Sequence, residues 1–233
     1  MDDSYTEQEQ WERAKAWIRE NGLWLLAGVA LGVGGLVGWN WWQERIETRA
    51  REASRQYEQL LEAFDRGDRT RAMTLVEQLR TDYGSSPYAD QADLAAARAH
   101  VEASELPQAA DRLARTMNAS KDQELRLIAR MRLARVQLAQ GNPDVALATL
   151  AAAADTGAFA PRFQELRGDV LFAKDDKAGA LREYRGARAA DAGGVLDTVS
   201  LELKIADLLA DGLSVDAAAA AGATPQSAPE VAR

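Results

Sequence analysis

A long run without a formal charge, from Asn21 to Gln43, constrains this chain more than any other feature of its sequence. Its apolar part, residues 23–42, would rise about 30 Å as a helix, which matches the hydrocarbon thickness of a bilayer. The run therefore predicts a single transmembrane helix. It would follow a tail of residues 1–22 and precede a polar domain of residues 43–211.

Two other structures could use such a run. A buried helix of a globular domain is disfavoured, because the run is apolar on every side and has tryptophans at its ends. A cleaved signal peptide needs small residues at its cleavage site, whereas residues 38–42 read Gly-Trp-Asn-Trp-Trp. The sequence therefore favours an anchor that stays attached.

Tryptophans and glycines suggest different roles along the predicted anchor. Tryptophan rings favour the membrane–water boundary, and the predicted interface residues are Trp24, Trp39 and Trp42. Small residues let two helices approach closely, and the predicted helix-packing face consists of Gly28, Gly32 and Gly35. Basic residues flank both ends in near balance, so the flanking charges do not orient the anchor.

The composition argues against several classes of site. The chain has no cysteine and a single histidine, His100, so disulfides, zinc–thiolate centres and two-histidine metal sites cannot form within one chain. The acidic pair Asp175 and Asp176 lies in a predicted turn, where such residues are mostly solvated. We predict no catalytic residue, no cofactor and no metal ligand. A net charge of −8 also disfavours binding to nucleic acid.

After Gln43 the sequence favours helix and repeats itself. Short breakers at residues 66–68, 84–87, 141–143 and 193–194 separate helical stretches. The apolar pattern of residues 133–150 recurs 34 residues later, which is the tetratricopeptide period, and also occurs 37 residues earlier. We predict an all-α fold, in which a tetratricopeptide-like solenoid of helical hairpins follows the anchor. A generic helical bundle is the alternative.

Small residues recur where the paired helices would approach most closely. The predicted packing positions are Ala134, Ala146, Gly168, Ala180 and Ala187. By the same register, the positions predicted to face a groove are Arg98, Arg135 and Asp169, each with an apolar residue one turn further on. Such a groove would suit an extended polypeptide.

The end of the domain is predicted to be a capping helix over residues 195–211. Four of its residues fall on one predicted inner face: Leu196, Val199, Leu203 and Ala206. Residues 212–233 are rich in Ala, Pro and Ser without an apolar period, which predicts a disordered tail.

Several short motifs, in a consistent order, carry a family resemblance. They are Glu20-Asn21-Gly22, Gly28-Val29, Leu31 to Gly34, Gly38-Trp39, Arg132 to Gln137, Leu166 to Asp169, Lys174 to Lys177, and Gly179-Ala180. The chain resembles the YfgM-like family of ancillary Sec translocon subunits from its N-terminal tail to about Asp211. The exit of the anchor is longer and richer in tryptophan than the family pattern.

The resemblance implies a single-pass protein of the inner membrane, with a cytoplasmic N-terminus and a periplasmic tetratricopeptide-like domain. The partners it implies are the SecYEG translocon, translocating polypeptides and a PpiD-like periplasmic chaperone. The implied function is that of a non-enzymatic scaffold or chaperone-like subunit that hands translocated chains to folding factors. The alternative is a cytoplasm-facing, membrane-tethered adaptor or stress-response regulator, which the balanced flanking charges allow.

Overall fold

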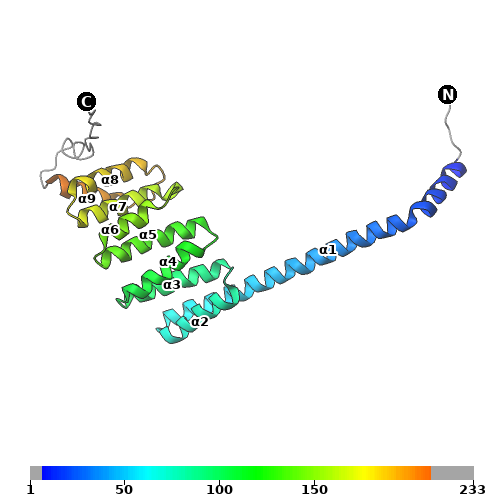
Figure 1. The fold of residues 1–233 in the computed structure, drawn as a ribbon, viewed down its shortest axis with the longest axis horizontal. Helices are drawn as coiled ribbons and strands as arrows, with labels where there is room; N and C mark the ends of the chain where they lie inside the picture. The colour runs from blue at the N-terminus through cyan, green and yellow to red at the C-terminus, as the bar shows by residue number, and fades with distance from the viewer. Residues whose placement is uncertain (1–6, 211–233) are drawn as a thin grey trace, which may run out of the picture. The chain divides into compact units, whose positions relative to one another are not determined.

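The computed structural model describes residues 7–210, and every regular element in this part of the chain is helical (Figure 1). The all-α prediction is therefore confirmed. The elements are α1 (Glu7–Asp65), α2 (Arg69–Tyr83), α3 (Pro87–Glu102), α4 (Leu106–Ala119), α5 (Gln123–Ala139), α6 (Pro143–Ala151), the 3₁₀ turn η1 (Gly157–Phe159), α7 (Ala160–Ala173), α8 (Lys177–Ala190) and α9 (Thr198–Ala210). The predicted tail of residues 212–233 lies outside the described residues.

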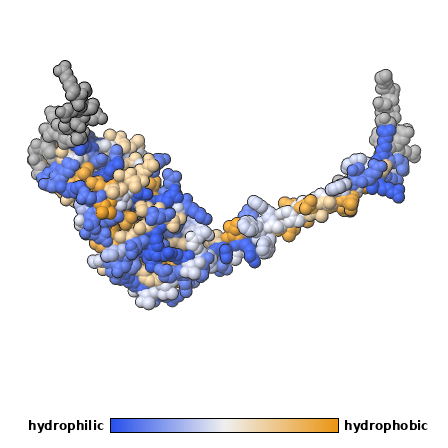
Figure 2. Space-filling model, viewed as in Figure 1, coloured by the Kyte–Doolittle hydropathy of each residue, from blue (hydrophilic) through white to orange (hydrophobic). Residues whose placement is uncertain are grey.

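The chain divides into two units between Arg55 and Gln56, within α1. The first unit is the N-terminal part of α1, and its large apolar side chains lie on the outside, with Leu23, Trp24 and Leu31 exposing 79%, 78% and 78% of their surface. Figure 2 shows hydrophobic residues along the middle of α1. Within the described residues no single helix is long and apolar enough to cross a membrane. Two stretches of α1, Trp11–Trp24 and Leu26–Asp65, meet that requirement together across a 45° bend.

The second unit consists of helical hairpins that all turn in the same way. One residue in each turn has a positive φ: Gly67 (73°), Ser104 (59°), Gly141 (78°) and Asp175 (63°). These four positions are separated by 37, 37 and 34 residues, the shifts found in the sequence. The hairpins are therefore the end of α1 with α2, α3 with α4, α5 with α6, and α7 with α8.

The hydrogen bonds of the turns repeat as well. The N–H group after each positive-φ residue donates to a carbonyl five residues back, which closes the first helix of the hairpin as a Schellman motif. The four bonds are Asp68 to Ala63 (2.8 Å), Glu105 to His100 (2.8 Å), Asn142 to Gln137 (3.0 Å) and Asp176 to Leu171 (2.9 Å). Each turn thus ends one helix and starts the next at equivalent positions.

Small residues lie where the helices of the hairpins pack. Four alanines of the second helices, one per hairpin, are fully buried: Ala72, Ala109, Ala146 and Ala180. Ala134 on α5 and Ala187 on α8 are fully buried too. Gly168 on α7 lies directly against the ring of Tyr184 on α8, where a Cβ atom would overlap the ring. The hairpins are therefore packed at contacts that leave no room for larger side chains.

The capping helix packs through a different face from the one predicted. The predicted inner residues Val199 and Leu203 are 69% and 66% exposed, whereas α9 buries Leu201, Ile205 and Leu208 against α8. Of the other two predicted inner residues, Leu196 is buried just before α9 and Ala206 is exposed. Both stripes have helical spacing, so the apolar pattern alone cannot choose between them.

Replacing Gly168 with alanine should destabilise the domain by about 1–3 kcal/mol, because the new methyl group would overlap the Tyr184 ring. The ring cannot move away easily, since it is buried and its hydroxyl donates to Asp169 Oδ1 at 2.9 Å. Urea denaturation followed by circular dichroism would measure the change. The control is Gly186→Ala on α8, whose Cβ would meet only the end of the Gln164 side chain. A similar gain in stability for both variants, as expected for helical Gly→Ala changes without a clash, would contradict the contact.

Candidate functional site

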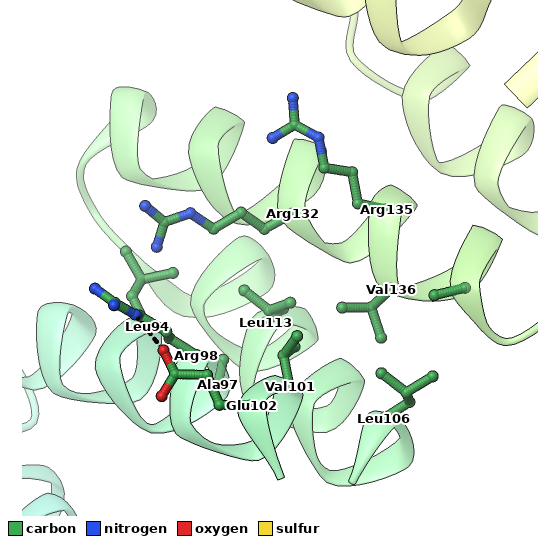
Figure 3. Close-up of a pocket in the computed structure, with 11 residues that line it drawn as sticks. Leu94, Ala97, Arg98, Val101, Glu102, Leu106, Leu113, Arg132, Arg135 and Val136 are labelled. Carbon is green, nitrogen blue, oxygen red and sulfur yellow. Dashed lines mark hydrogen bonds and ion pairs between the residues drawn. The ribbon is translucent and has the colours of Figure 1, made fainter. Parts of the chain in front are cut away.

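A pocket with a volume of about 400 Å³ lies between α3, α4 and α5 (Figure 3). Its lining residues come from two successive hairpins: Leu94, Ala97, Arg98, Val101 and Glu102 of α3, Leu106 and Leu113 of α4, and Arg132, Arg135, Val136 and Ala139 of α5. The pocket is therefore a product of the repeat, since it needs the first helix of one hairpin to face the first helix of the next.

The floor of the pocket is apolar and belongs to the core. Leu94, Leu113 and Val136 are at least nine-tenths buried and pack in one cluster. Towards the opening, Val101 is 42% exposed and Leu106 is half-buried. Ala97 and Ala139 are small, so the helices leave a hollow between the larger side chains. An aliphatic or aromatic side chain that enters this hollow would remove its apolar surface from water, which favours binding.

The rim of the pocket is basic. The Arg98 Nε atom donates to Glu102 Oε1 at 2.8 Å, an ion pair within α3. Within residues 7–210, no hydrogen bond or ion pair holds the side chains of Arg132 and Arg135 on α5. Figure 3 shows the two side chains extending from α5 in different directions, Arg135 away from the labelled apolar residues and Arg132 towards the side on which Leu94 and Arg98 are drawn. The rim can therefore offer two guanidinium groups to an incoming acceptor.

The three residues predicted to face a groove do not lie together. Arg98 and Arg135 both line the pocket, whereas Asp169 is not among its lining residues. Asp169 instead pairs with Lys204 Nζ of α9 at 2.7 Å and accepts from the Tyr184 hydroxyl. Sequence reasoning missed Arg132, although its spacing of three residues from Arg135 places both on one helix face.

Ionic contacts join α3 and α4, two walls of the pocket, to each other and to α2. Arg112 of α4 donates to Asp93 of α3 at 2.9 Å and to Glu77 of α2 at 2.6 Å. Asp93 is buried, and this burial raises its pKa even though the bond from Arg112 acts in the opposite direction. The guanidinium group of Arg112 thus joins three helices around one buried carboxylate.

A second ionic contact lies at the start of α4, next to the pocket residue Leu106. Glu105 accepts from Arg69 Nη1 of α2 at 3.0 Å, and its other oxygen lies 2.6 Å from His100 Nδ1 of α3. The hydrogen bond from Arg69, followed by that from His100, lowers the pKa of Glu105 from 4.5 to about 2. The only histidine of the chain is therefore part of a structural ion cluster.

The residues predicted to meet a membrane all lie on α1. The tryptophans Trp24, Trp39 and Trp42 are 78%, 64% and 61% exposed. Apart from the adjoining residues and the nearby backbone of α1 itself, no heavy atom of the described structure lies within 4 Å of the position that a Cβ atom would take at Gly28, Gly32 or Gly35. The Arg45 guanidinium lies 4.3 Å from the centroid of the Trp41 ring, near the end of the uncharged run. Among the described residues, no group of three or more His, Asp or Glu side chains could hold a metal ion.

Comparison with known proteins places the chain in a family. The family model described as a tetratricopeptide repeat-like domain matches residues 15–210. A relative from Escherichia coli (strain K12) is 32% identical over 202 residues, which cover 87% of this chain and 96% of the relative, and it is named ancillary SecYEG translocon subunit. The chain belongs to this family. The resemblance inferred from its motifs is therefore confirmed.

Other relatives agree with this family. Proteins with the same name from Aggregatibacter actinomycetemcomitans and Haemophilus influenzae are 30% and 29% identical, each over 88% of this chain and over 100% and 98% of their own lengths. Among solved structures, a MamA RS-1 ArsTM double mutant matches with a TM-score of 0.55 at 12% identity, over 72% of this chain and 89% of that chain. At this identity the structural match supports the helical-repeat fold alone.

Acid should weaken the contact between the first two hairpins, because the folded-state pKa of Glu105 is lowered. The ionised carboxylate stabilises the fold above the usual pKa of 4.5, and this contribution is lost as the pH falls from 4.5 towards 2. The urea concentration at the unfolding midpoint should be measured between about pH 3 and pH 7. As the pH is lowered, this midpoint should fall less steeply for Glu105→Gln than for the parent chain. Glu58→Gln, at an exposed position of α1, is the control. Equal slopes for all three proteins would rule out the contribution.

Proposed function

We propose that this chain is a membrane-anchored, non-enzymatic subunit that associates with the Sec translocon and binds polypeptide segments in the pocket between α3, α4 and α5. The observation that carries the proposal is the near full-length match to proteins named ancillary SecYEG translocon subunit. The apolar pocket on a repeat domain supports the binding role, since concave repeat surfaces commonly bind extended chains.

The anchor in this proposal is residues 23–42, which would span the inner membrane once. Exposed apolar side chains along this part of α1 support it, because such a surface is stable in lipid and costly in water. Residues 1–22 would lie in the cytoplasm and residues 43–211 in the periplasm. Gly28, Gly32 and Gly35 would form the face on which a second membrane helix packs, and Trp24, Trp39 and Trp42 would lie at the interfaces.

The role of the domain would be to hold newly translocated polypeptides and to pass them to periplasmic folding factors, such as a PpiD-like chaperone. Shallow apolar binding suits this role because it gives weak, reversible contacts. The alternative location is the cytoplasmic side, where the same domain would act as an adaptor or regulator. This alternative is supported by one observation. The basic residues at the two ends of the uncharged run are nearly balanced, so the flanking charges do not orient the anchor.

A fusion of alkaline phosphatase after Asp211 tests the location of the domain. The enzyme matures only outside the cytoplasm, so we expect high activity from cells that carry the fusion. The control has the opposite readout: green fluorescent protein fused at the same position should give no fluorescence. An inactive phosphatase together with a fluorescent partner fusion would favour the cytoplasmic adaptor.

Replacing Val101 with aspartate tests the pocket. A carboxylate at the opening of an apolar site should weaken polypeptide binding about tenfold or more, because the apolar occupant would have to desolvate it. The control is Val145→Asp on α6, a valine that is 51% exposed and lies outside the pocket. Mild-detergent purification from cells that hold a stalled translocating polypeptide would measure the bound chain and the Sec components. We expect Val101→Asp to lose the chain and keep SecYEG. Repeated absence of SecYEG from the parent sample would contradict the translocon association.

A further inference from the structure

The pocket carries a local charge opposite to that of the whole protein. Its lining residues include three arginines and one glutamate, which gives a local charge of +2. The chain as a whole has a net charge of −8. A partner attracted to this basic rim must therefore be recognised at short range, because the net charge repels acidic molecules from a distance.

The arginines of α5 divide into two pairs with different surroundings. Arg126 and Arg130 donate to the carbonyls of Ser120 and Thr149 at 2.9 and 2.8 Å, so they serve the fold. The other pair, Arg132 and Arg135, is exposed, and within residues 7–210 neither guanidinium has a protein acceptor. These two groups are thus the ones left for a ligand at the pocket rim.

We propose that the pocket selects polypeptide segments in which an aliphatic side chain is flanked by carboxylates. The aliphatic group would fill the hollow between Leu94, Leu113 and Val136, and the carboxylates would pair with Arg132 and Arg135. This proposal specifies which polypeptides the pocket of the proposed function would bind. It rests on that function only in assuming that the occupant is a polypeptide.

The spacing of the two arginines fits such a segment. Residues three apart on a helix lie about 5–6 Å from each other at their Cβ atoms. Side chains two residues apart on an extended segment lie about 7 Å from each other and on the same side. An aliphatic residue with an acidic residue two positions to either side therefore presents all three side chains on one side, with the two acidic residues about 14 Å apart. Long arginine side chains can span this distance, and each guanidinium can hold a carboxylate through two parallel hydrogen bonds. The aliphatic side chain between the two acidic residues, which lies on the same side of the segment, can then reach the apolar floor.

Arg98 makes a smaller contribution to the selection. Its guanidinium is already paired with Glu102, whose carboxylate would repel an acidic group on that side of the pocket. The α5 side has no such acid among the lining residues. The acidic groups of the occupant are therefore expected over α5, and its apolar groups towards Val101 and Leu106.

Peptide binding to the full chain in detergent or nanodiscs tests the selection. The probes are two labelled nonapeptides with a central leucine, one with aspartates two residues to either side and the other with asparagines there. We expect fluorescence anisotropy to show about tenfold tighter binding of the aspartate peptide, with the difference falling as salt is raised. The double variant Arg132→Glu/Arg135→Glu should remove this preference. Arg71→Glu, a charge reversal at an exposed position of α2 outside the pocket, is the control and should retain it.

A charge swap separates recognition from structural damage. The double variant should bind a third nonapeptide, with lysines in place of the aspartates, more tightly than the parent chain does. Circular dichroism would confirm that the variant keeps its helices.

Each remaining outcome has a defined meaning. Equal binding of the aspartate and asparagine peptides overturns the selection while leaving polypeptide binding in place, and a lack of binding by both peptides also overturns it. Tighter binding of the parent chain to anionic lipid vesicles than to the aspartate peptide would point to a headgroup as the ligand, against the proposal. Loss of SecYEG co-purification with the peptide preference retained would instead count against the proposed function.

Discussion

Close packing of paired helices at small residues is the constraint on which the rest of the domain depends. The first helix of each hairpin can lie against the second only where a glycine or alanine leaves room, as at Gly168 beneath the Tyr184 ring and at the fully buried Ala134 and Ala146. The turns enforce the same geometry, since one positive-φ residue and one Schellman closure recur in every hairpin. Helix after helix is thus placed at an equivalent position.

The pocket follows from this regularity. Successive first helices, α3 and α5, face each other across α4, and small residues at Ala97 and Ala139 leave a hollow over the buried leucines. Ion pairs at Arg112 and at Glu105 join α2, α3 and α4 without using the rim. The charged groups of the domain therefore separate into those that hold the walls and those that face solvent at the opening.

Ion pairs accompany the packing of the last helix. Lys204 of α9 reaches Glu165 and Asp169 of α7 at 2.9 and 2.7 Å, and it lies over the ring of Tyr184. With this lysine turned towards α7, the stripe of Leu201, Ile205 and Leu208 faces the core. The competing apolar stripe, which includes Val199 and Leu203, is left on the surface. Asp169 makes this contact on α7, in the last hairpin, whereas Arg98 and Arg135 line a pocket formed by α3, α4 and α5.

The sequence by itself determined the helical class, the hairpin boundaries and the period, because these depend on local turn chemistry and on apolar spacing along one chain. It also predicted small residues at positions such as Gly168, since a repeat places equivalent contacts at equal intervals. Only the tertiary structure decided which face of α9 is buried and which arginines remain free. Those outcomes depend on contacts between residues far apart in the chain, such as Arg69 with Glu105 and Lys204 with Glu165, and helical periodicity carries no information about such partners.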